Sequence, residues 1–178
     1  MANKKLSDLH QTILTIAQDF DVFCKKNGIT YYLMGGSALG AMRHQGFIPW
    51  DDDFDVFMDN TNYYKFLSIA KKKLDKDKYY LQEEDTSEWP LFFSKIRMNN
   101  TTFIEQDVAQ LPIHHGIYID IMCLNNAFNS KPLRFLQYFS AKILSASVLG
   151  KRGYATNSFA KKVILKIASL AVFGFIKI

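Results

Sequence analysis

The sequence has little cysteine, and it lacks the long apolar run that a membrane-spanning helix needs. Both cysteines, Cys24 and Cys123, lie in apolar stretches, so we exclude a disulfide scaffold and expect buried thiols in a reducing compartment. The longest candidate span, residues 167–176, has only ten residues, about half of what a bilayer requires. Charged residues interrupt the N-terminal region where a secretory signal would be apolar. These absences predict a cytoplasmic protein.

Acidic residues are missing from one end of the chain and concentrated at one point elsewhere. Residues 131–178 contain no Asp or Glu, whereas five Asp lie within residues 51–59. The 178 residues are 48% hydrophobic and carry a formal charge of +5, which excludes a disordered chain and allows a buried core. We interpret the acidic block as a site and the basic end as a surface.

Apolar periodicity and glycine placement predict an α+β core. Apolar residues at three- and four-residue steps predict a helix over 6–27, which ends before Gly28. β-branched and aromatic residues predict a strand over 29–34, followed by a turn at Gly35-Gly36. The further predicted elements are a helix over 38–43 capped by Ser37, a strand over 53–58, a helix from 60 or 61 to 73, a hairpin with arms 91–97 and 101–105 around Asn99-Asn100, and a strand over 116–121.

After residue 130 the chain changes to long apolar stretches with basic residues. We predict helices over 132–150 and 158–176, so that a core over 1–130 precedes a helical segment over 131–178. Such helices favour contact with an anionic membrane surface, and packing against a further C-terminal region is the alternative. The sequence stops without a Gly, Pro or capping residue, so truncation is one interpretation. The basic residues are Lys131, Arg134, Lys142, Lys151, Arg152, Lys161, Lys162, Lys166 and Lys177.

The acidic block has the pattern of a metal site. On a strand, Asp51, Asp53 and Asp55 would point to one side and Asp52 to the other. Like charges on one face repel, and a divalent cation offsets this; all-oxygen ligands suit Mg²⁺ or Mn²⁺. Two such ions can clamp the attacking and leaving oxygens of a phosphoryl transfer. A solvated acidic turn is the alternative, which the flanking apolar residues disfavour.

A phosphate cradle is predicted shortly before the acidic block. Gly35, Gly36 and Ser37 lie between a predicted strand and a predicted helix. Backbone N–H groups at a helix N-terminus, with the Ser37 hydroxyl, can donate to phosphate oxygens. Phosphoryl transfer needs this combination, because positioning and charge neutralisation supply most of the catalysis.

Residues 32–56 read YLMGGSALGAMRHQGFIPWDDDFDV, and this segment closely resembles the signature of the LicD family, relatives of fukutin and fukutin-related protein. Residues 95–97, 100–103 and 115–121 resemble later blocks of that family, so the resemblance covers roughly residues 6–125. It implies a nucleotidyltransferase-type fold, with a mixed β-sheet flanked by helices. It also implies a metal-dependent phosphotransferase that moves phosphocholine, or a related phospho-alcohol, from a CDP-activated donor to a sugar of a cell-surface glycan such as lipopolysaccharide, teichoic acid or capsule.

The resemblance also implies roles for individual residues. Asp53 and Asp55 correspond to paired metal ligands, Asp120 to a third carboxylate that binds the metal or acts as general base, and Asp51 to an outer ligand. The expected substrate-binding residues are Gly35, Gly36, Ser37, Arg43, Lys95 and Arg97. For the three cationic residues, surface charge or pairing with the Asp cluster is the alternative.

Two other functions use the same residues. A nucleotidyltransferase would release pyrophosphate instead of CMP, and a non-catalytic domain would bind glycan or nucleotide without turnover. The expected partners are the CDP-activated donor and a glycan acceptor, lipid-linked and reached at the inner face of the membrane. A nucleic-acid partner is not expected, because the candidate site is acidic and no reader motif is present.

Overall fold

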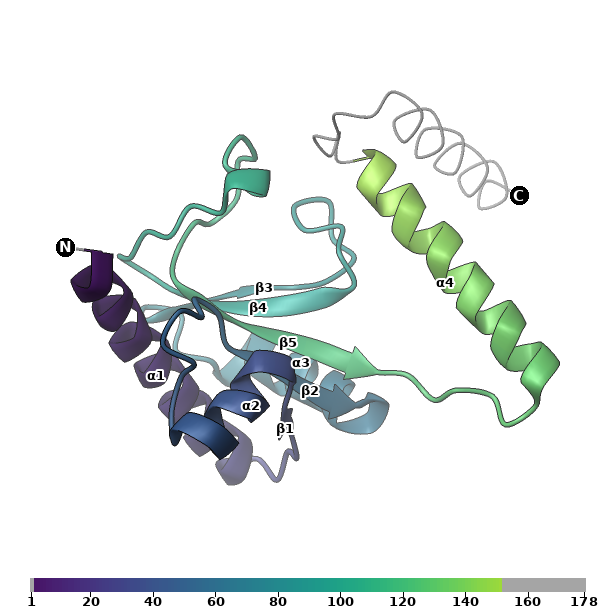
Figure 1. Ribbon diagram of the computed structural model, residues 1–178, viewed down its shortest axis with the longest axis horizontal. Helices are drawn as coiled ribbons and strands as arrows, with labels where there is room; N and C mark the ends of the chain where they lie inside the picture. Colours follow the sequence, from purple (N-terminus) through teal and green to yellow (C-terminus); the bar gives the residue numbers. More distant parts are fainter. Residues whose placement is uncertain (1, 152–178) are drawn as a thin grey trace. The chain divides into compact units, whose positions relative to one another are not determined.

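The computed structural model describes residues 2–151, and the chain divides into two compact units, Met1–Asn125 and Asn126–Ile178. A five-stranded sheet in the order β1-β2-β5-β4-β3 organises the first unit (Figure 1), which confirms the predicted α+β class with a mixed sheet. The strands are β1 (Tyr32–Leu33), β2 (Asp55–Asp59), β3 (Tyr79–Gln82), β4 (Phe93–Met98) and β5 (Tyr118–Leu124). The helices are α1 (Ala2–Lys26), α2 (Gly35–His44), α3 (Asn60–Lys73), the short 3₁₀ helix η1 (Gln106–Val108) and α4 (Lys131–Lys151).

Strand β5 lies at the centre of the sheet and is parallel to β2 and antiparallel to β4. The other neighbours, β1 with β2 and β3 with β4, are antiparallel. The chain leaves β2 through α3 and reaches β5 only after β3 and β4. Residues far apart in the sequence therefore meet on the three middle strands.

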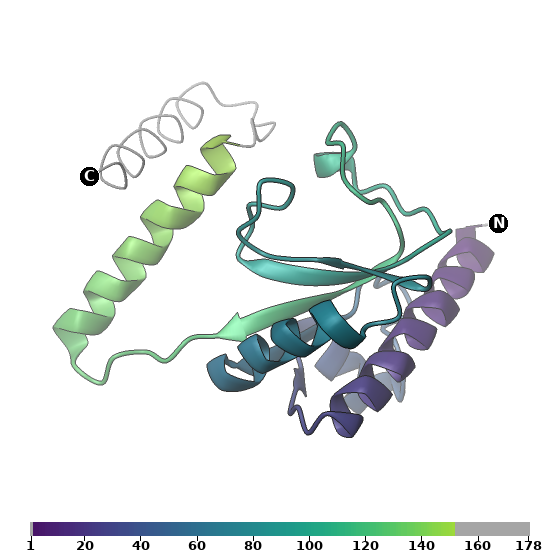
Figure 2. The same ribbon diagram turned by 180° about the vertical axis from the view of Figure 1, so that it is seen from behind.

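Helices α1 and α3 cover one face of the sheet, and Figure 2 shows both in front of it. Alternation along the strands buries Val56 and Met58 of β2 with Ile119 and Ile121 of β5 on this side. The apolar stripes of the two helices close the core with Ile13, Ile16, Phe20 and Cys24 of α1 and Tyr63, Phe66, Leu67 and Ala70 of α3. The opposite face is left for the polar members of the same strands.

The predicted hairpin around Asn99-Asn100 is wrong. Asn100 does turn the chain, with φ at 59°, but residues 101–105 form no strand. Strand β4 pairs instead with β3 on one edge and β5 on the other. A strand has only two edges, so the segment after the turn is left outside the sheet. We did not predict β3, because its four residues follow a highly charged stretch and are too few to show a period.

In the second unit, α4 confirms the helix predicted over 132–150, whereas the helix predicted over 158–176 lies outside the described residues. Among residues 2–151, no helix is both long enough and apolar enough to cross a bilayer. The exposed large apolar side chains of α4 are Leu133, Phe135, Leu136, Tyr138, Phe139, Ile143 and Leu144.

Candidate active site

Two predicted site residues meet across the parallel pair of strands. Asp55 of β2 and Asp120 of β5 are register partners, so their side chains point to the same face from strands about 4.8 Å apart. Burial, together with the Asp120 charge, raises the pKa of Asp55 to about 6. Burial also raises the pKa of Asp120 to about 6, although the Lys95 charge acts in the opposite direction. The pair is therefore costly to ionise without a further cation.

The loop before β2 adds three more carboxylates. One oxygen from each of Asp51, Asp52 and Asp53 lies within 4.8 Å of the others. We expected Asp52 to point away from its neighbours, and this is wrong: the strand begins at Asp55, two residues later than predicted, and alternation holds only within a strand. Burial, and then the charges of Asp55, Asp51 and Asp52, raise the pKa of Asp53 to about 6. Asp53 thus links the loop to the strand pair.

The first turn of α2 lies against this loop. Gly35 has φ at 53°, in the left-handed region that favours glycine. A side chain at Gly36 would collide with the Asp51 carboxylate, so the absence of a Cβ lets that carboxylate approach the helix. We expected Ser37 to cap α2, but the N-cap is Met34, which makes no side-chain cap bond. The Ser37 hydroxyl instead accepts a hydrogen bond of 2.8 Å from the backbone N–H of Asp55, which ties α2 to the start of β2.

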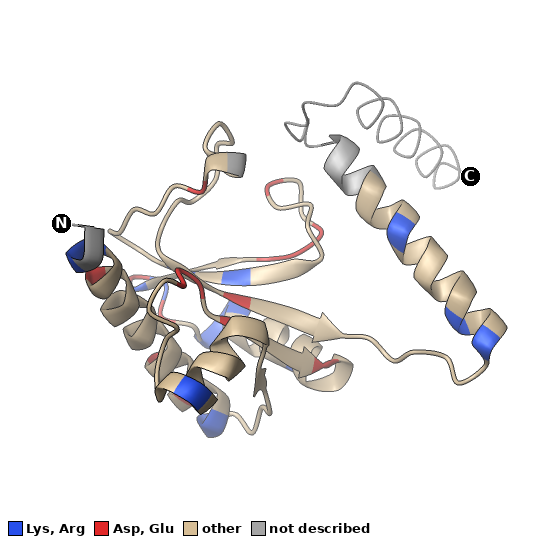
Figure 3. Ribbon diagram, viewed as in Figure 1, with Lys and Arg blue, Asp and Glu red and all other residues tan. Residues whose placement is uncertain are grey.

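Lys95 supplies a buried cation beside Asp120. The two residues are register partners on β4 and β5, and the Lys95 Nζ lies 2.9 Å from the Asp120 Oδ1. The same Nζ lies 3.5 Å from Oε1 of Glu105 and 3.3 Å from the ring centre of Tyr118. The side chain is 1% exposed, and burial lowers the pKa of Lys95. Figure 3 shows basic and acidic residues side by side on these neighbouring strands.

The two predicted arginines have very different surroundings. Arg97 is 0% exposed, and it donates to Gln82 Oε1 at 2.8 Å, to the Gly116 carbonyl at 3.0 Å and to Glu105 Oε2 at 3.4 Å. Its guanidinium is thus engaged by the protein. Arg43 lies exposed in the last turn of α2, where it is accessible to a substrate.

His10 and Glu105 belong to the site but did not emerge from sequence reasoning. His10 Nε2 donates to the backbone carbonyl of Asp51 at 2.6 Å, and its ring stacks on Phe47 at 4.4 Å with an interplanar angle of 3°. Glu105 bridges Lys95 and Arg97. Local pattern could not have revealed the first contact, because it joins residues 41 positions apart. Glu105 is an isolated acidic residue, and no sequence pattern around it marks it as part of a site.

The donor set has the chemistry of a divalent-cation site. Asp53, Asp55 and Asp120 offer only carboxylate oxygens, which hard cations prefer. Among the described residues, Asp120 Oδ1 is one of three buried side-chain polar atoms without a hydrogen-bond partner, although the Lys95 ammonium lies close to it. The Lys95 Nζ lies 2.9 Å from this oxygen, and the second lone pair of the oxygen could still bind a metal ion.

Comparison with known proteins identifies a family and several relatives that this chain resembles. The family described as LicD/FKTN/FKRP, nucleotidyltransferase domain, matches residues 28–135. Lipopolysaccharide cholinephosphotransferase LicD of Haemophilus influenzae is 44% identical over 68 residues, which are 37% of this chain and 26% of that protein. Ribitol 5-phosphate transferase FKRP of Mus musculus is 23% identical over 141 residues, 78% of this chain and 28% of that protein.

Mannosyltransferase regulator 4 of Saccharomyces cerevisiae is 26% identical over 127 residues, which cover 67% of this chain and 10% of that protein. The matched part of the chain thus spans between about a tenth and about three tenths of these three relatives.

Proposed function

We propose that this chain, which belongs to the LicD/FKTN/FKRP family, is a metal-dependent phosphotransferase that moves a phospho-alcohol from a CDP-activated donor to a sugar of a glycan. The observation that carries the proposal is the pairing of Asp55 with Asp120 directly beside the acidic loop. Two relatives are named for transferring a phosphate-bearing alcohol, phosphocholine in one and ribitol 5-phosphate in the other. Their names support the class of group transferred and leave its identity open.

In this proposal Asp53, Asp55 and Asp120 hold Mg²⁺ or Mn²⁺, and Asp51 acts as an outer ligand. The bound ions would neutralise the charge of the transferring phosphoryl group. The raised pKa values of Asp53, Asp55 and Asp120 fit this assignment, since a cluster that resists ionisation on its own is relieved by a cation.

The residues of the chain then have distinct tasks. Backbone N–H groups in the first turn of α2, at Gly35 and Gly36, hold phosphate oxygens of the donor, and Arg43 adds a charge from the end of that helix. Ser37 fixes the start of β2 through the Asp55 N–H. In the general-base role, the Asp120 carboxylate accepts the proton of the acceptor hydroxyl. The acceptor oxygen forms the new bond to phosphorus, the bond to CMP breaks, and CMP leaves.

Lys95 acts on Asp120 from β4, which lies on the other edge of β5 from Asp55. Its ammonium contacts both Asp120 and Glu105. The Glu105 carboxylate therefore holds the Lys95 ammonium in position beside Asp120. This arrangement keeps the buried Asp120 ionisable near neutral pH. Arg97 holds Glu105 in turn.

We also place the protein in the cytoplasm at the inner face of the membrane, where α4 would rest on anionic lipid and a lipid-linked acceptor would be within reach. Basic Lys131, Arg134 and Lys142 lie among the exposed apolar residues of α4, as in helices that bind membrane surfaces. Packing of the same apolar residues against a further part of the protein is the alternative.

The proposal is tested by incubating the protein with Mg²⁺ and CDP-choline, CDP-ribitol or CDP-glycerol, with and without glycan acceptor, and assaying CMP. Metal-dependent release of CMP supports the phosphotransferase. Release of pyrophosphate from CTP would identify a nucleotidyltransferase instead. A protein that binds nucleotide or glycan without any metal-dependent turnover would be a non-catalytic domain.

A further inference from the structure

A hollow of about 600 Å³ opens beside the acidic loop. It is formed by the N-terminal half of α1, by the loop itself, and by the segment that runs from β4 to β5. We call it the α1 hollow. The residues that matter most for its chemistry are Leu9, Thr12, Asp52, Thr102, Phe103 and Ile117.

The α1 hollow is continuous with the candidate metal site through Asp52. That residue lines the hollow, and its carboxylate oxygen lies within 4.8 Å of those of Asp51 and Asp53. A molecule bound in the hollow therefore lies next to the carboxylates. Phe103 is held in place by a hydrogen bond of 2.7 Å from its backbone N–H to the His115 carbonyl, so this wall is anchored to the segment that leads into β5.

The lining has the wrong charge for the donor diphosphate. Two carboxylates, from Asp8 and Asp52, and one ammonium, from Lys5, face the hollow, which leaves it net negative. An anionic diphosphate would be repelled there, whereas the N–H groups of α2 near Gly36 attract it. The α1 hollow thus suits a different and uncharged partner.

The same lining has the groups that bind a polyhydroxylated ring. Carboxylates of Asp8 and Asp52 accept hydrogen bonds from hydroxyls, and the Thr102 hydroxyl can donate and accept. The Thr12 hydroxyl donates to the Asp8 carbonyl at 3.0 Å and can accept a hydrogen bond from a ligand. Leu9, Phe103 and Ile117 add apolar surface on which the C–H groups of a sugar can pack. A small number of convergent polar groups over an apolar surface is typical of a small-molecule site.

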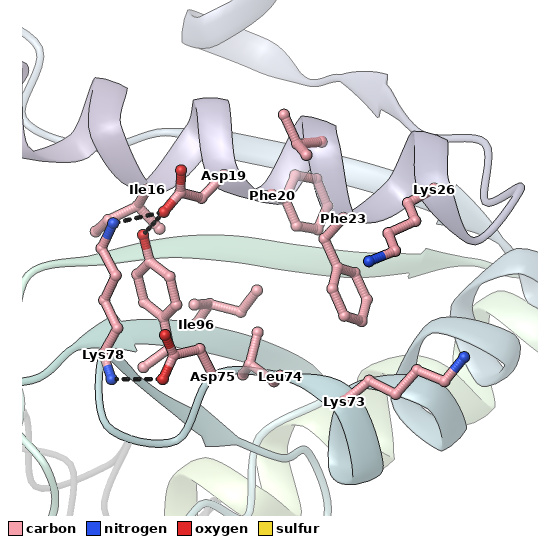
Figure 4. Close-up of a pocket in the computed structure, with 12 residues that line it drawn as sticks. Ile16, Asp19, Phe20, Phe23, Lys26, Lys73, Leu74, Asp75, Lys78 and Ile96 are labelled. Atoms are coloured by element: carbon pink, nitrogen blue, oxygen red, sulfur yellow. Dashed lines mark hydrogen bonds and ion pairs between the residues drawn. The ribbon is translucent and has the colours of Figure 1, made fainter.

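A second hollow, of about 310 Å³, is less well placed (Figure 4). It is lined by Phe20 of α1, Leu74 and Ile96, which belong to or pack on the core beneath α1 and α3. That core lies on the opposite face of the sheet from Asp55 and Asp120. Its ligand would be separated from the carboxylates by the sheet.

We propose that the α1 hollow is the acceptor subsite, which holds a neutral sugar so that one hydroxyl faces the carboxylate cluster. This assignment rests on the proposed function for the identity of the reacting partner. It also extends the site beyond the family match at residues 28–135, because Leu9 and Thr12 lie on α1, before the match begins.

The test is a titration of ¹⁵N-labelled protein with the methyl glycosides of glucose, galactose, N-acetylglucosamine and N-acetylgalactosamine, followed by amide chemical shifts. At least one sugar should shift amides of residues 5–12 and 101–103. Phe103→Ala should raise the Kd for that sugar at least tenfold. Thr12→Trp, which fills the hollow, should raise the same Kd by at least as much. Ile104→Ala is the matched control, because Ile104 is 57% exposed and does not line the hollow.

Calorimetry with the CDP-activated donor separates this inference from the proposed function. Donor Kd should change less than twofold in Phe103→Ala. If Thr12→Trp does not fold, Phe103→Ala alone decides. The inference is overturned if none of the sugars shifts these amides, if the sugar Kd is the same in Phe103→Ala, or if the donor Kd is the one that rises. Failure of CMP release with every donor would instead refute the proposed function, and the sugar titration would still report on the hollow.

Discussion

Asp120 is the register partner of Asp55 on one side of β5 and of Lys95 on the other. The central strand thus places one carboxylate between a like charge and an opposite charge. Asp55 disfavours ionisation of Asp120, and Lys95 favours it. Whether Asp120 is ionised depends on which of these two neighbours has the larger effect. A bound cation would favour the ionised form.

The carboxylate cluster should make the metal-free protein less stable as pH rises. Because the folded-state pKa of Asp55 is raised from 3.8 to about 6, the folded state binds more protons than the unfolded state between these values, so stability falls as pH rises through about 4 to 6. Asp55→Asn should remove this loss, which solvent screening limits to about 1–2 kcal/mol. Thermal unfolding with a chelator at pH 4 and pH 7.5 measures it.

Asp77→Asn is the control for that experiment, because Asp77 is exposed and lies outside the cluster. Its unfolding should keep the wild-type dependence on pH. Added Mg²⁺ should restore stability at pH 7.5 in the wild-type protein and much less in Asp55→Asn. An equal pH dependence in wild type and Asp55→Asn would show that Asp55 is not strained by its neighbours.

Much of this arrangement followed from the sequence. The periodicity of α1 and α3, the strand through Asp120 and the proximity of Asp55 to Asp120 all rest on local patterns or on the family resemblance. The partner of β4, the orientation of Asp52 and the bond from Ser37 to Asp55 did not follow. Each depends on which segments become neighbours in space, and no local period reports that.

Gly36→Ala should weaken donor binding at little cost in stability. The new Cβ would collide with the Asp51 carboxylate, a flexible group that can move aside, and Ala is favoured over Gly in a helix by about 1 kcal/mol. The shifted carboxylate and the added methyl group would together obstruct the α2 N–H groups, so donor Kd measured by calorimetry should rise at least tenfold. Gly46→Ala is the control, since a Cβ there meets only the His44 carbonyl at 4.0 Å. Unchanged affinity in Gly36→Ala would remove α2 from the donor site.

Lys95→Met should shift the acid limb of the pH–rate profile to higher pH. Loss of the ammonium removes the charge that lowers the pKa of Asp120, so Asp120 would need a higher pH to act as a base. Measuring kcat from pH 5 to pH 9 tests this, with exposed Lys72→Met as the control. A profile that falls in height without moving along the pH axis would contradict the role given to Lys95.

His10→Phe should lower the affinity for Mg²⁺ several-fold while the fold stays intact. Phe can keep the stacking on Phe47, but it cannot donate to the Asp51 carbonyl, so the acidic loop loses one hydrogen bond to α1. Titration with Mn²⁺, followed by paramagnetic relaxation of water, measures the affinity. His44→Phe is the matched control on an exposed helix end. Equal affinity in His10→Phe and wild type would show that the contact is only structural.

The most direct test of the account is the Mg²⁺-dependent release of CMP by Asp120→Asn, measured beside the wild-type protein with the same donor and acceptor. Asn preserves the size of the side chain but can neither accept the proton nor carry the charge. We predict that kcat falls at least about a hundredfold, while donor Kd changes less than about tenfold because α2 still holds the donor. Release of CMP at the wild-type rate by Asp120→Asn would contradict the assignment of Asp120 and, with it, the pairing of Asp55 and Asp120 as the centre of the site.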